Sequence, residues 1–415
     1  MKILLWHGYL LGGTGSNVYT RSLARAWSRL GHEVVVFSQE SHPELYDLGG
    51  AATVRPDLRG PLPVFVLDRY EDLEPRYLQD LTRRERDEFV ERNAAVVRAH
   101  LPADYLLVNH VLLGAPVGAA AGLPFVVKAH GSELEFSIRG NEELVAWARE
   151  ALARAREVVV GSEHIRRVLE DVLGWNERIR VVPPGVDVEE LRPEERDTAL
   201  PRLLAEAGRD PPATSERLPD EGNAERLERF FADAAPTVVY VGKLSREKGV
   251  HLLLSALASI GARAVVVGFG PARAELEAQA AANVLFTGPL EHRHLAHLWP
   301  LADVSVTPSV FPEAFGMVAA EAAACGSPPL VARHSGLAEV AAGLEAEYPP
   351  EHRELVSFAS GDVDDLAAKL AALLALPRPE WERLSAAARR AAVERWSWEH
   401  IAALLLSGAW EKPSA

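Results

Sequence analysis

The feature that most constrains the fold of this chain is the alternation of apolar runs with helix-forming segments. The opening "MKILLWHGYLLGGTGSNVYTRSLARAWSRLGHEVVVFSQE" contains an apolar run, a Gly-rich turn, a segment that places Tyr19, Leu23 and Trp27 on one helical face, and a second apolar run. This order is typical of a βαβ unit, and strands that are apolar throughout are typical of a parallel sheet covered on both faces. The sequence therefore predicts an α/β protein.

Apolar runs of this kind occur in two series. The first series continues at residues 104–109, 125–130, 157–162 and 178–187, and the second consists of "TVVYVGKL", "ARAVVVGFG", "NVLFTG", "DVSVTP" and "PPLVA". A chain of 415 residues is too long for one ordinary domain and can bury two cores. We predict two doubly wound, Rossmann-like domains that face each other across a cleft, with ligands bound beyond the carboxyl ends of the strands.

Changes in composition mark the expected domain boundaries. Residues 1–186 form the predicted N-terminal domain and residues 236–392 the C-terminal domain. The intervening residues 187–235 are charged and contain proline, which indicates a linker or an insertion. We expect residues 393–415 to form a helix that packs back toward the N-terminal domain.

Charge and cysteine content exclude several classes of protein. The net charge of −15 argues against a chain that wraps nucleic acid, because neutralising phosphates requires clustered Lys and Arg. No apolar run approaches the roughly 20 residues of a membrane-spanning helix. The one cysteine, Cys325, excludes an intrachain disulfide, and its Ala-rich surroundings predict a buried core residue. We expect a cytoplasmic protein.

Two of the six lysines fall in "VGKLSREKGV" (241–250), at the end of the first strand of the second series. Arginine is the usual cation of this chain, so Lys243 and Lys248 stand out. Loop cations at such a position can converge on an anion. Considered alone, the segment also fits a solvated charged loop.

Gly-rich turns follow several of the predicted strands. In "GGTGSNVY", Gly12 and Gly13 precede a helix, where backbone N–H groups can approach a phosphate or a sugar oxygen. The spacing departs from G-x-G-x-x-G with a following acidic residue, which disfavours a dinucleotide cofactor. The turn "VVVGFGP" (265–271), which contains Gly268, suits a flat ligand group or a simple tight turn, and "LFTGPL" (285–290) repeats the pattern.

His130 follows a predicted strand directly, in "FVVKAHGSELEF". A single histidine is usually structural, but where a strand leaves the sheet its side chain is expected to project into the cleft. A structural and a functional histidine are equally compatible with this position.

Two carboxylates lie on either side of a helix start in "FPEAFGMVAAEAAACG" (311–326). Glu313 is expected at the end of a loop, beside free N–H groups of a helix that begins near Phe315 or Gly316, and Glu321 about one and a half turns further on. A carboxylate there can accept two hydrogen bonds from a vicinal diol. Alternatively, Glu313 only complements the helix dipole and Glu321 is exposed. The apolar surroundings favour burial, and hence a partner.

Together these segments resemble the GT-B glycosyltransferases of family GT4, which are retaining enzymes that use sugar nucleotides. The resemblance rests on strand–"GGxG"–helix, on "VGKLSREKG" and above all on "PEAFGMVAAEAAACGSP", which is similar to the E-x7-E motif of that family. It extends through "VVPPGVD" to "WSWEHIA" but does not cover residues 190–235. It implies transfer of a hexosyl group from a nucleoside-diphosphate sugar, bound by the C-terminal domain, to a small-molecule or lipid-linked hydroxyl acceptor on the side of the N-terminal domain.

The resemblance also implies roles for the loop cations and the Gly-rich turn. Lys243 and Lys248 are expected to bind the donor diphosphate, with the amides of Gly12 or Gly13 nearby. The family usually has arginine where this chain has Lys243, and lysine keeps the charge but loses the bidentate fork. "GSNVY" resembles the acceptor loop of the branch that glycosylates inositol phosphate. The implied acceptor contacts are Asn17 and Tyr19.

The donor sugar and its nucleoside are assigned by the same resemblance. Glu313 is expected to hold hydroxyls of the transferred sugar, Glu321 the ribose, and His130 the sugar near its reacting carbon. The remaining implied donor contacts are Gly242, Gly268, Leu290 at the base, Phe315, Gly316, Met317 and Val318.

No metal and no other cofactor is implied, because lysines and helix N-termini are expected to offset the charge on the leaving diphosphate. "GDVDD" (361–365) matches the D-x-D motif of metal-dependent transferases, but its place before "LAAKLAALLAL" favours a helix cap. His292, His294 and His297 are interpreted as surface histidines rather than as a zinc site, since no set of Cys or carboxylate ligands accompanies them.

Two alternative functions share the predicted architecture. A GT-B sugar-nucleotide 2-epimerase needs no acceptor, so analysis of products formed from donor alone separates it from a transferase. A catalytically silent sugar-nucleotide-binding subunit would bind donor without turnover. The intact pair of carboxylates and the two loop lysines disfavour a silent subunit.

Overall fold

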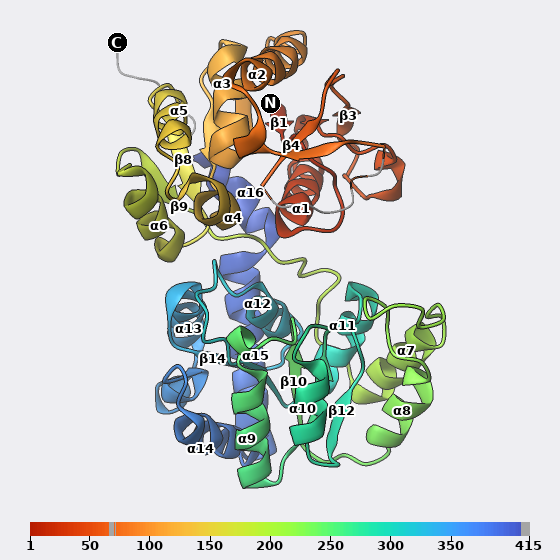
Figure 1. The fold of residues 1–415 in the computed structure, drawn as a ribbon. Helices are drawn as coiled ribbons and strands as arrows, with labels where there is room; N and C mark the ends of the chain where they lie inside the picture. The colour runs from red at the N-terminus through yellow and green to blue at the C-terminus, as the bar shows by residue number, and fades with distance from the viewer. Residues whose placement is uncertain (66–69, 71, 408–415) are drawn as a thin grey trace. The chain divides into compact units, whose positions relative to one another are not determined.

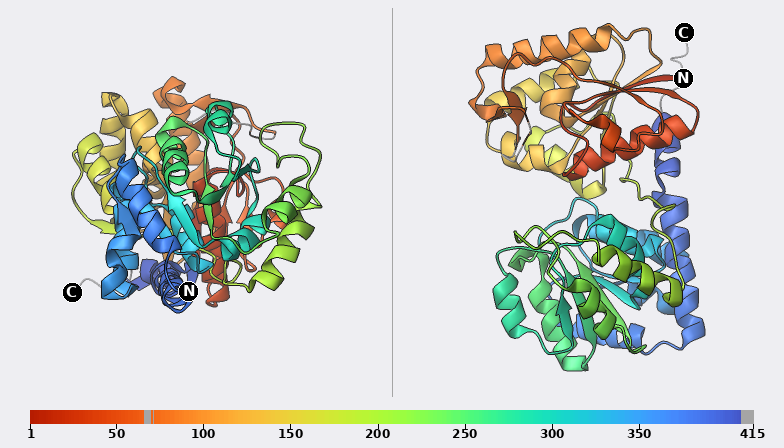
Figure 2. Two further views of the ribbon diagram at one scale, coloured as in Figure 1. Left: turned by 90° about the horizontal axis from the view of Figure 1, so that it is seen from below. Right: turned by 90° about the vertical axis from the view of Figure 1, so that its right-hand side faces the viewer.

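The structure of the protein is a computed structural model that describes residues 1–65, 70 and 72–407. The chain forms two compact units (Figure 1). The first comprises Met1–Gly185 with the chain from Trp398 onward, and the second comprises Val186–Ser397. Within each unit, helices cover a parallel sheet, as the two further views in Figure 2 also show. Residues 408–415 of the predicted C-terminal helix lie outside the described residues.

The first unit is built on a seven-stranded parallel sheet in the order β3-β2-β1-β6-β7-β8-β9. Its strands are β1 (Lys2–Trp6), β2 (Glu33–Phe37), β3 (Ala52–Val54), β6 (Tyr105–Asn109), β7 (Val126–Lys128), β8 (Glu157–Val160) and β9 (Ile179–Val181). The chain proceeds outward from β1 to β3 and then, in the opposite direction, from β6 to β9. The strand order therefore reverses between β1 and β6, and ligands of doubly wound sheets bind at such a switch point.

Helices flank this sheet, and the last described helix belongs to the same unit. They are α1 (Gly15–Arg29), α2 (Arg83–Arg98), α3 (Ala115–Ala121), α4 (Gly131–Glu133), α5 (Glu142–Leu152), α6 (Glu163–Leu173) and α16 (Trp398–Ser407). Shorter elements are the turns η1 (Pro43–Leu45), η2 (Leu78–Asp80), η3 (His110–Gly114) and η4 (Leu134–Ile138), and the small pair β4 (Leu62–Val64) and β5 (Pro75–Tyr77). Trp27 of α1 donates a hydrogen bond to the carbonyl oxygen of Ala402 at 3.0 Å, which ties α16 to the first unit.

The second unit has a six-stranded parallel sheet in the order β12-β11-β10-β13-β14-β15. Its strands are β10 (Thr237–Val241), β11 (Arg263–Val267), β12 (Val284–Phe286), β13 (Val304–Thr307), β14 (Pro329–Ala332) and β15 (Ser357–Phe358). The order reverses between β10 and β13. The first strands of both sheets thus lie beside a switch point, as the doubly wound pattern requires.

The helices of the second unit include two from the segment that precedes its sheet. They are α7 (Arg196–Ala207), α8 (Asn223–Phe230), α9 (Val250–Ile260), α10 (Arg273–Gln279), α11 (His292–Leu298), α12 (Met317–Ala324), α13 (Ser335–Glu347), α14 (Val363–Leu374) and α15 (Arg378–Trp396). Its turns are η5 (Arg246–Lys248), η6 (Trp299–Leu301) and η7 (Pro350–Val356). Val186 and Ser397 form a bridge, so the first and last residues of the second unit lie side by side in space.

Residues 187–235, expected as a linker or an insertion, contribute to the core of the second unit. Leu203 of α7, Leu227 of α8 and Phe231 are buried in it. Asn223 Nδ2 donates to the carbonyl oxygen of Thr287, just after β12, at 2.9 Å. Although the segment is rich in charge, the apolar residues of its two helices are spaced so that they face the core of the unit.

The strands predicted from the apolar runs are present. Most end within a few residues of the predicted position, but β9 ends at Val181, well before the predicted end at residue 187. Four further strands, β3, β4, β5 and β15, were not predicted. They are only two or three residues long, which is too short for an alternating or continuous apolar pattern to identify. Cys325 is buried and is not part of a disulfide, as predicted.

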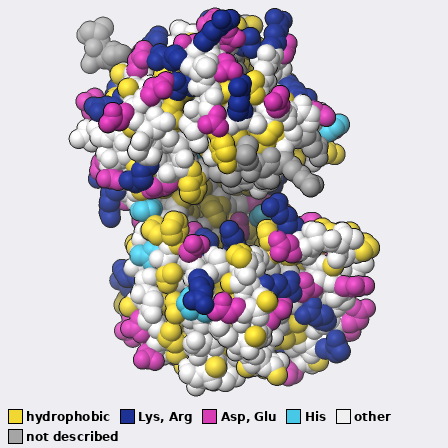
Figure 3. Space-filling view, in the orientation of Figure 1, with side chains coloured by type: hydrophobic (Ala, Val, Ile, Leu, Met, Phe, Trp, Pro, Cys, Tyr) yellow, Lys and Arg dark blue, Asp and Glu magenta, His cyan; other side chains and the backbone are white. Residues whose placement is uncertain are grey.

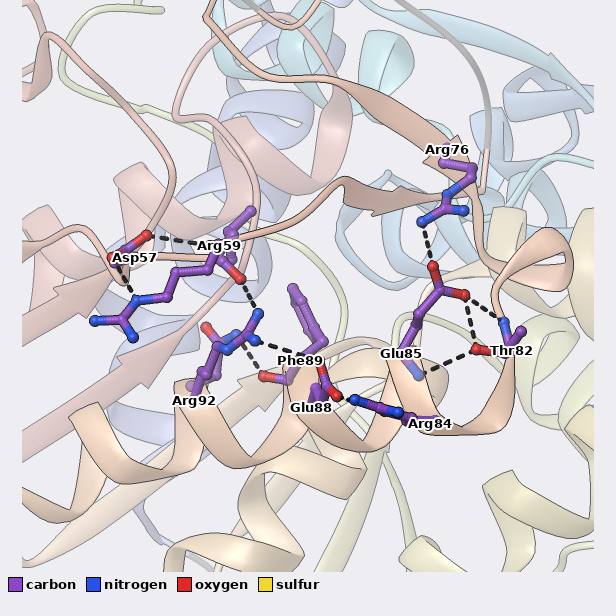
Figure 4. A network of polar contacts seen from close by, with 11 residues as sticks. Asp57, Arg59, Arg76, Thr82, Arg84, Glu85, Glu88, Phe89 and Arg92 are labelled. Carbon is purple, nitrogen blue, oxygen red and sulfur yellow. Dashed lines mark hydrogen bonds and ion pairs between the residues drawn. The ribbon is translucent and has the colours of Figure 1, made fainter.

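Helix α2 begins at a capping box that also connects it to β5 (Figure 4). Thr82 is the N-cap residue and its hydroxyl oxygen accepts from the backbone N–H of Glu85, while the Glu85 carboxylate accepts from the N–H of Thr82 at 2.8 Å. Arg76 of β5 pairs with the same carboxylate at 2.6 Å. The cap satisfies N–H groups that the first turn of a helix leaves without a partner.

On the face drawn in Figure 3, Lys and Arg side chains are interspersed with Asp and Glu side chains. Although the sequence has more acidic than basic residues, side chains of both charges therefore occur on this face. Within the described part of the chain, no helix is long and apolar enough to cross a membrane.

Candidate active site

The two loops that follow β10 and β13 flank the switch point of the second sheet, and backbone contacts fasten them together. The carbonyl oxygen of Glu247 accepts from the N–H of Val310 at 2.9 Å and of Phe311 at 3.1 Å. Gly249 has φ +70°, and a Cβ built on it would lie 1.9 Å from the carbonyl oxygen of Pro308. Only glycine allows this approach, so the glycine of "REKG" is required for the two loops to meet.

This junction brings together two of the predicted site residues. Lys248 Nζ lies 2.5 Å from Glu313 Oε1, and their side chains are 31% and 22% exposed. Both groups are therefore partly accessible at the edge of the sheet where a ligand is expected. In such a pair the lysine can bind an anion, and the carboxylate can accept hydrogen bonds from hydroxyl groups.

Lys243 is the second predicted cation of this site. Its side chain is exposed. Within the residues that the structure describes, no carboxylate lies within ion-pairing distance of it. The backbone of Lys243 is anchored although its side chain is not, because its carbonyl oxygen accepts a hydrogen bond from the hydroxyl of Tyr240 at 2.9 Å. A cation that is held at its base and has no partner is available to bind an anion.

Helix α12 starts close to the prediction of Phe315 or Gly316. Gly316 is its N-cap residue with φ +126°, and a Cβ there would lie 2.7 Å from Leu337 of α13. Phe315 is buried and its ring contacts Trp396 edge-on, with centroids 6.0 Å apart. Met317 is the first residue of the helix. Backbone N–H groups in the first turn of a helix have no carbonyl partner within the helix, because no turn precedes them. The helix start thus combines unpaired donors with the positive end of a dipole.

Glu321 lies inside α12 with 14% of its side chain exposed, so the alternative of a solvent-exposed residue is wrong. Its Oε1 is 3.4 Å from His292 Nε2, which belongs to α11. The predicted base contact, Leu290, is partly buried two residues before that helix. Glu321 and Leu290 therefore come from α12 and from the residues just before α11, and the contact of Glu321 with His292 joins these two segments.

The predicted glycine contacts form a tight backbone junction between β10, β11 and β12. A Cβ on Gly268, whose φ is +143°, would lie 1.8 Å from the carbonyl oxygen of Gly242. Gly268 in turn donates to the carbonyl oxygen of Gly288 at 2.9 Å. The absence of a Cβ at these positions therefore lets the ends of the three strands lie close together.

In the first unit, His130 follows β7 and is oriented by Asn109 at the end of β6. The amide group of Asn109 donates to the carbonyl oxygen of Trp6 and to Thr20, so its Oδ1 accepts from His130 Nε2 at 2.9 Å. Burial, together with the charges of Lys128 and His7, lowers the pKa of His130 well below its ordinary value. The imidazole is therefore neutral near pH 7, with its free lone pair on Nδ1.

Two further histidines, which were not predicted as site residues, follow β1 and β6 beside His130. His7 is fully buried, its Nε2 lies 2.8 Å from Asn17 Oδ1, and burial lowers its pKa to about 4. His110 has φ +73°, and its ring centroid is 4.7 Å from that of His130. The rule that singled out His130, a polar residue directly after a strand, would also have identified both.

Glu133 lies under this group and is fully buried. Its carboxylate accepts from the N–H groups of Val111, Leu112 and His130 at 2.9 to 3.2 Å. His110 Nδ1 is 3.8 Å away, but burial lowers the pKa of His110 and raises that of Glu133 to about 7. The two side chains therefore do not form a fully charged pair at neutral pH.

The remaining predicted residues of the first unit divide into surface and core. Gly13, with φ +91°, is exposed, and a Cβ on Gly12 would lie 2.4 Å from the hydroxyl of Tyr46. Asn17 is buried and its amide also bonds to the carbonyl oxygen of Gly12, so it holds the Gly-rich turn. Tyr19 is buried between Trp398 and His130, with centroids 5.4 and 5.8 Å away. Its side chain packs in the core and does not reach the surface.

The two metal-site alternatives raised by the sequence have structural explanations. Asp362 caps α14, accepting from the N–H groups of Asp364 and Asp365 at 3.0 Å, which confirms the helix cap. The interpretation of surface histidines is wrong for His294, which is fully buried with Nε2 3.0 Å from Asp210 Oδ1. Helix α7 covers that side of α11, and burial lowers the pKa of His294. Across the described residues, no three His, Cys, Asp or Glu side chains gather as metal ligands.

Comparison with solved structures identifies the architecture. A sucrose-phosphate synthase from Thermosynechococcus elongatus matches with a TM-score of 0.65 and 24% identity, over 98% of this chain and 97% of that one. HepE from Anabaena, solved in complex with UDP, matches with a TM-score of 0.68 and 19% identity, over 98% and 99%. The two Rossmann-like units thus have the GT-B fold of glycosyltransferases.

Comparison of sequences identifies the family. The model of "Glycosyltransferase Family 4" matches residues 13–190, and that of "Glycosyl transferases group 1" matches residues 224–391. An MMP alpha-(1->4)-mannosyltransferase from Mycolicibacterium hassiacum is 30% identical over 94% of this chain and 92% of its own length. A D-inositol 3-phosphate glycosyltransferase from Mycolicibacterium paratuberculosis is 28% identical over 95% and 84%. The chain belongs to glycosyltransferase family 4 and is an enzyme of that class.

Proposed function

We propose that this glycosyltransferase takes a hexosyl group from a nucleoside-diphosphate sugar that binds at the switch point of the second sheet. The observation that carries the proposal is the meeting of Lys248 and Glu313 at 2.5 Å, beside the unpaired Lys243 and the start of α12. Cations, a carboxylate and free N–H groups are the set that a diphosphate joined to a sugar requires. The UDP complex of HepE, which has the same fold, supports a nucleotide ligand.

In this proposal each part of the donor has its own partners. Lys243 and Lys248 bind the diphosphate and offset the negative charge that grows on it as the bond to the sugar breaks. Glu313 and the backbone at residues 315–318 hold hydroxyl groups of the sugar, and Glu321 holds the ribose. The partly buried Glu321 can accept two hydrogen bonds from a vicinal diol.

His130 is the proposed contact of the first unit with the donor sugar. Its neutral ring and the bond from Nε2 to Asn109 leave Nδ1 as an acceptor for a sugar hydroxyl. The acceptor is proposed to be a hydroxyl group of a small molecule or of a lipid-linked sugar, positioned by the turn that Asn17 fastens. One relative is named for inositol 3-phosphate, which is a small polyol phosphate.

We further propose that transfer retains the anomeric configuration and requires no metal. The acceptor hydroxyl then attacks on the face that the diphosphate leaves, and its proton passes to a diphosphate oxygen. The new bond joins the acceptor oxygen to the anomeric carbon while the bond to the diphosphate breaks. The residues of this chain hold the two partners and offset charge, and none forms a covalent intermediate.

A thermal-shift panel of UDP, GDP, ADP and their glucose and mannose conjugates tests the donor. A ligand at a hundred times its dissociation constant adds about 2.7 kcal/mol of stability, a shift of roughly 5–10 °C for a unit of this size. We expect one nucleotide series to produce such a shift. No shift with any nucleotide would contradict the proposal, and conversion of the donor to its epimer without acceptor would favour the epimerase instead.

A further inference from the structure

The backbone of Glu313 is held at two points by the first turn of α13. Its N–H donates to the hydroxyl oxygen of Ser335 at 2.8 Å, and its carbonyl oxygen accepts from the N–H of Gly336 at 3.0 Å. A Cβ on Gly336 would lie 2.5 Å from the Cα of Phe315. The loop that carries Glu313 therefore rests directly on the start of this helix.

His334 completes a chain of hydrogen bonds with a defined direction. Its Nε2 lies 2.6 Å from the carbonyl oxygen of Ser309, which can only accept, so Nε2 carries a proton. In the neutral ring Nδ1 then accepts from the hydroxyl of Ser335, 3.0 Å away. The Ser335 oxygen is left to accept from Glu313. The same three side-chain bonds thus join the beginning of the loop, at Ser309, to the residue that holds the sugar.

The conformation of Ser335 shows that its hydroxyl is the feature that matters. Its φ is +47°, in the left-handed region where an L-residue costs roughly 1–2 kcal/mol and glycine does not. A glycine at this position would relieve the strain, and it would also remove the bond to Glu313. Serine is therefore unfavourable for the backbone and favourable only for the contacts of its side chain.

We propose that Ser335 and His334 are positioning residues that aim the Glu313 carboxylate at the hydroxyl groups of the donor sugar. The inference rests on the proposed role of Glu313 and extends it to two residues that do not touch the donor. They act on recognition of the sugar, because the bonds end at Glu313. Binding of the nucleoside diphosphate depends on them only through the contact of Lys248 with Glu313, because Lys243 is anchored separately, by Tyr240.

Two substitutions at one position separate this role from a structural one. Ser335→Gly removes the hydroxyl and the strain, whereas Ser335→Ala removes only the hydroxyl. Binding of UDP, GDP and their glucose and mannose conjugates is measured by calorimetry, and turnover by release of nucleoside diphosphate. Both variants are expected to weaken binding of the conjugate and to lower kcat/KM about tenfold, the loss typical of one hydrogen bond. Dissociation constants for free UDP or GDP should stay within about twofold of wild type.

Stability gives the readout that a structural role would predict differently. Ser335→Gly should unfold at or above the wild-type temperature and still be impaired in turnover, while Ser335→Ala unfolds below Ser335→Gly. The His334→Ala variant should show the same loss of sugar binding. His334→Asn, whose amide oxygen can accept near the place of Nδ1, should recover part of it.

Wild-type kcat/KM in Ser335→Gly would overturn the proposal, and so would equal weakening of free nucleotide and conjugate. Activity that follows the melting temperatures of the two Ser335 variants would also overturn it. Glu313→Ala is measured in parallel. If Glu313→Ala binds and turns over donor like the wild type, the role of Glu313 fails as well. If only the Ser335 variants are unaffected, the proposed function stands and the positioning role fails.

Discussion

Replacing Lys248 by alanine tests whether this residue binds the donor or only stabilises the fold. Its Nζ is 2.5 Å from Glu313, and about a third of its side chain is exposed. Ion pairs between partly exposed groups contribute only about 0–1 kcal/mol to folding stability. Glu313 keeps access to water after the change, because 22% of its side chain is exposed. We therefore expect a loss of at most about 1 kcal/mol in the free energy of unfolding.

The expected loss of activity is much larger. Removing one preorganised donor to a developing negative charge costs about 2.7–4 kcal/mol of transition-state stabilisation, which lowers kcat/KM about a hundredfold to a thousandfold. The effect on catalysis should thus exceed the effect on stability severalfold. A residue that only held the two loops together would show the two effects in proportion.

Lys369 provides a matched control in the same unit. It is a half-buried lysine in α14 whose Nζ donates to the carbonyl oxygen of Ser357 at 2.5 Å and lies 3.7 Å from Asp365. Lys369→Ala should lower stability by about as much as Lys248→Ala and leave kcat/KM unchanged. Denaturant unfolding and initial rates are measured on both variants. Activity of Lys248→Ala within threefold of wild type, at unchanged stability, would refute the reasoning.

Three further predictions concern the fold. Gly268→Ala places a Cβ 1.8 Å from the carbonyl oxygen of Gly242 and should lower the free energy of unfolding by about 3 kcal/mol. Gly361, with φ +82°, has open space around its Cβ position, so Gly361→Ala should lower it by only about 1 kcal/mol. Both are measured by denaturant unfolding. His7 is protonated below about pH 6.5 in the unfolded chain but only near pH 4 in the folded one. The free energy of unfolding should therefore fall by about 3 kcal/mol as the pH is lowered across this interval. His7→Gln should flatten this dependence of stability on pH. Thr82→Ala should cost about 1 kcal/mol by loss of the cap, and Thr82→Ser should cost little.

Each of these has an outcome that contradicts it. Equal stability of the Gly268 and Gly361 variants would show that the strand ends separate without cost. An unchanged slope of stability against pH in His7→Gln would show that His7 is not the group that protonates on unfolding. If alanine and serine at Thr82 unfold at the same denaturant concentration, the cap contributes nothing.

Much of the fold could be predicted because strand and helix periodicities are local. The apolar runs that form β1, β2, β10 and β11 are long enough to identify from sequence, and glycines mark their ends. The short strands β3 and β15 depend on neighbours that are distant in the sequence, and so they were missed. Residues 187–235 lacked a strand pattern, although α7 and α8 contribute apolar side chains to the core of the second unit.

That segment also explains the wrong interpretation of His294. The histidine lies on a side of α11 that α7 covers, and with α7 regarded as part of a linker or an insertion nothing indicated burial. Because α7 was not placed against α11, the burial of His294 was not predicted. The same reasoning applies to Tyr19, whose burial depends on Trp398, the start of α16.

The site was predictable where chemistry lies next to a strand or a helix start. Lys248, Glu313 and Glu321 were identified by residue type and position, and the structure places the first two in contact. Ser335 and His334 were not identified, because their bonds reach residues 22 and 25 positions earlier. A serine with positive φ cannot be recognised without the backbone conformation.

The most direct test of the account is a crystal structure of the protein with the nucleoside diphosphate that gives the largest thermal shift. We predict that oxygens of the diphosphate lie within about 3 Å of Lys248 Nζ and of Lys243 Nζ, with the ribose hydroxyl groups on Glu321. A diphosphate bound away from both lysines, at any other place on the protein, would contradict the central claim.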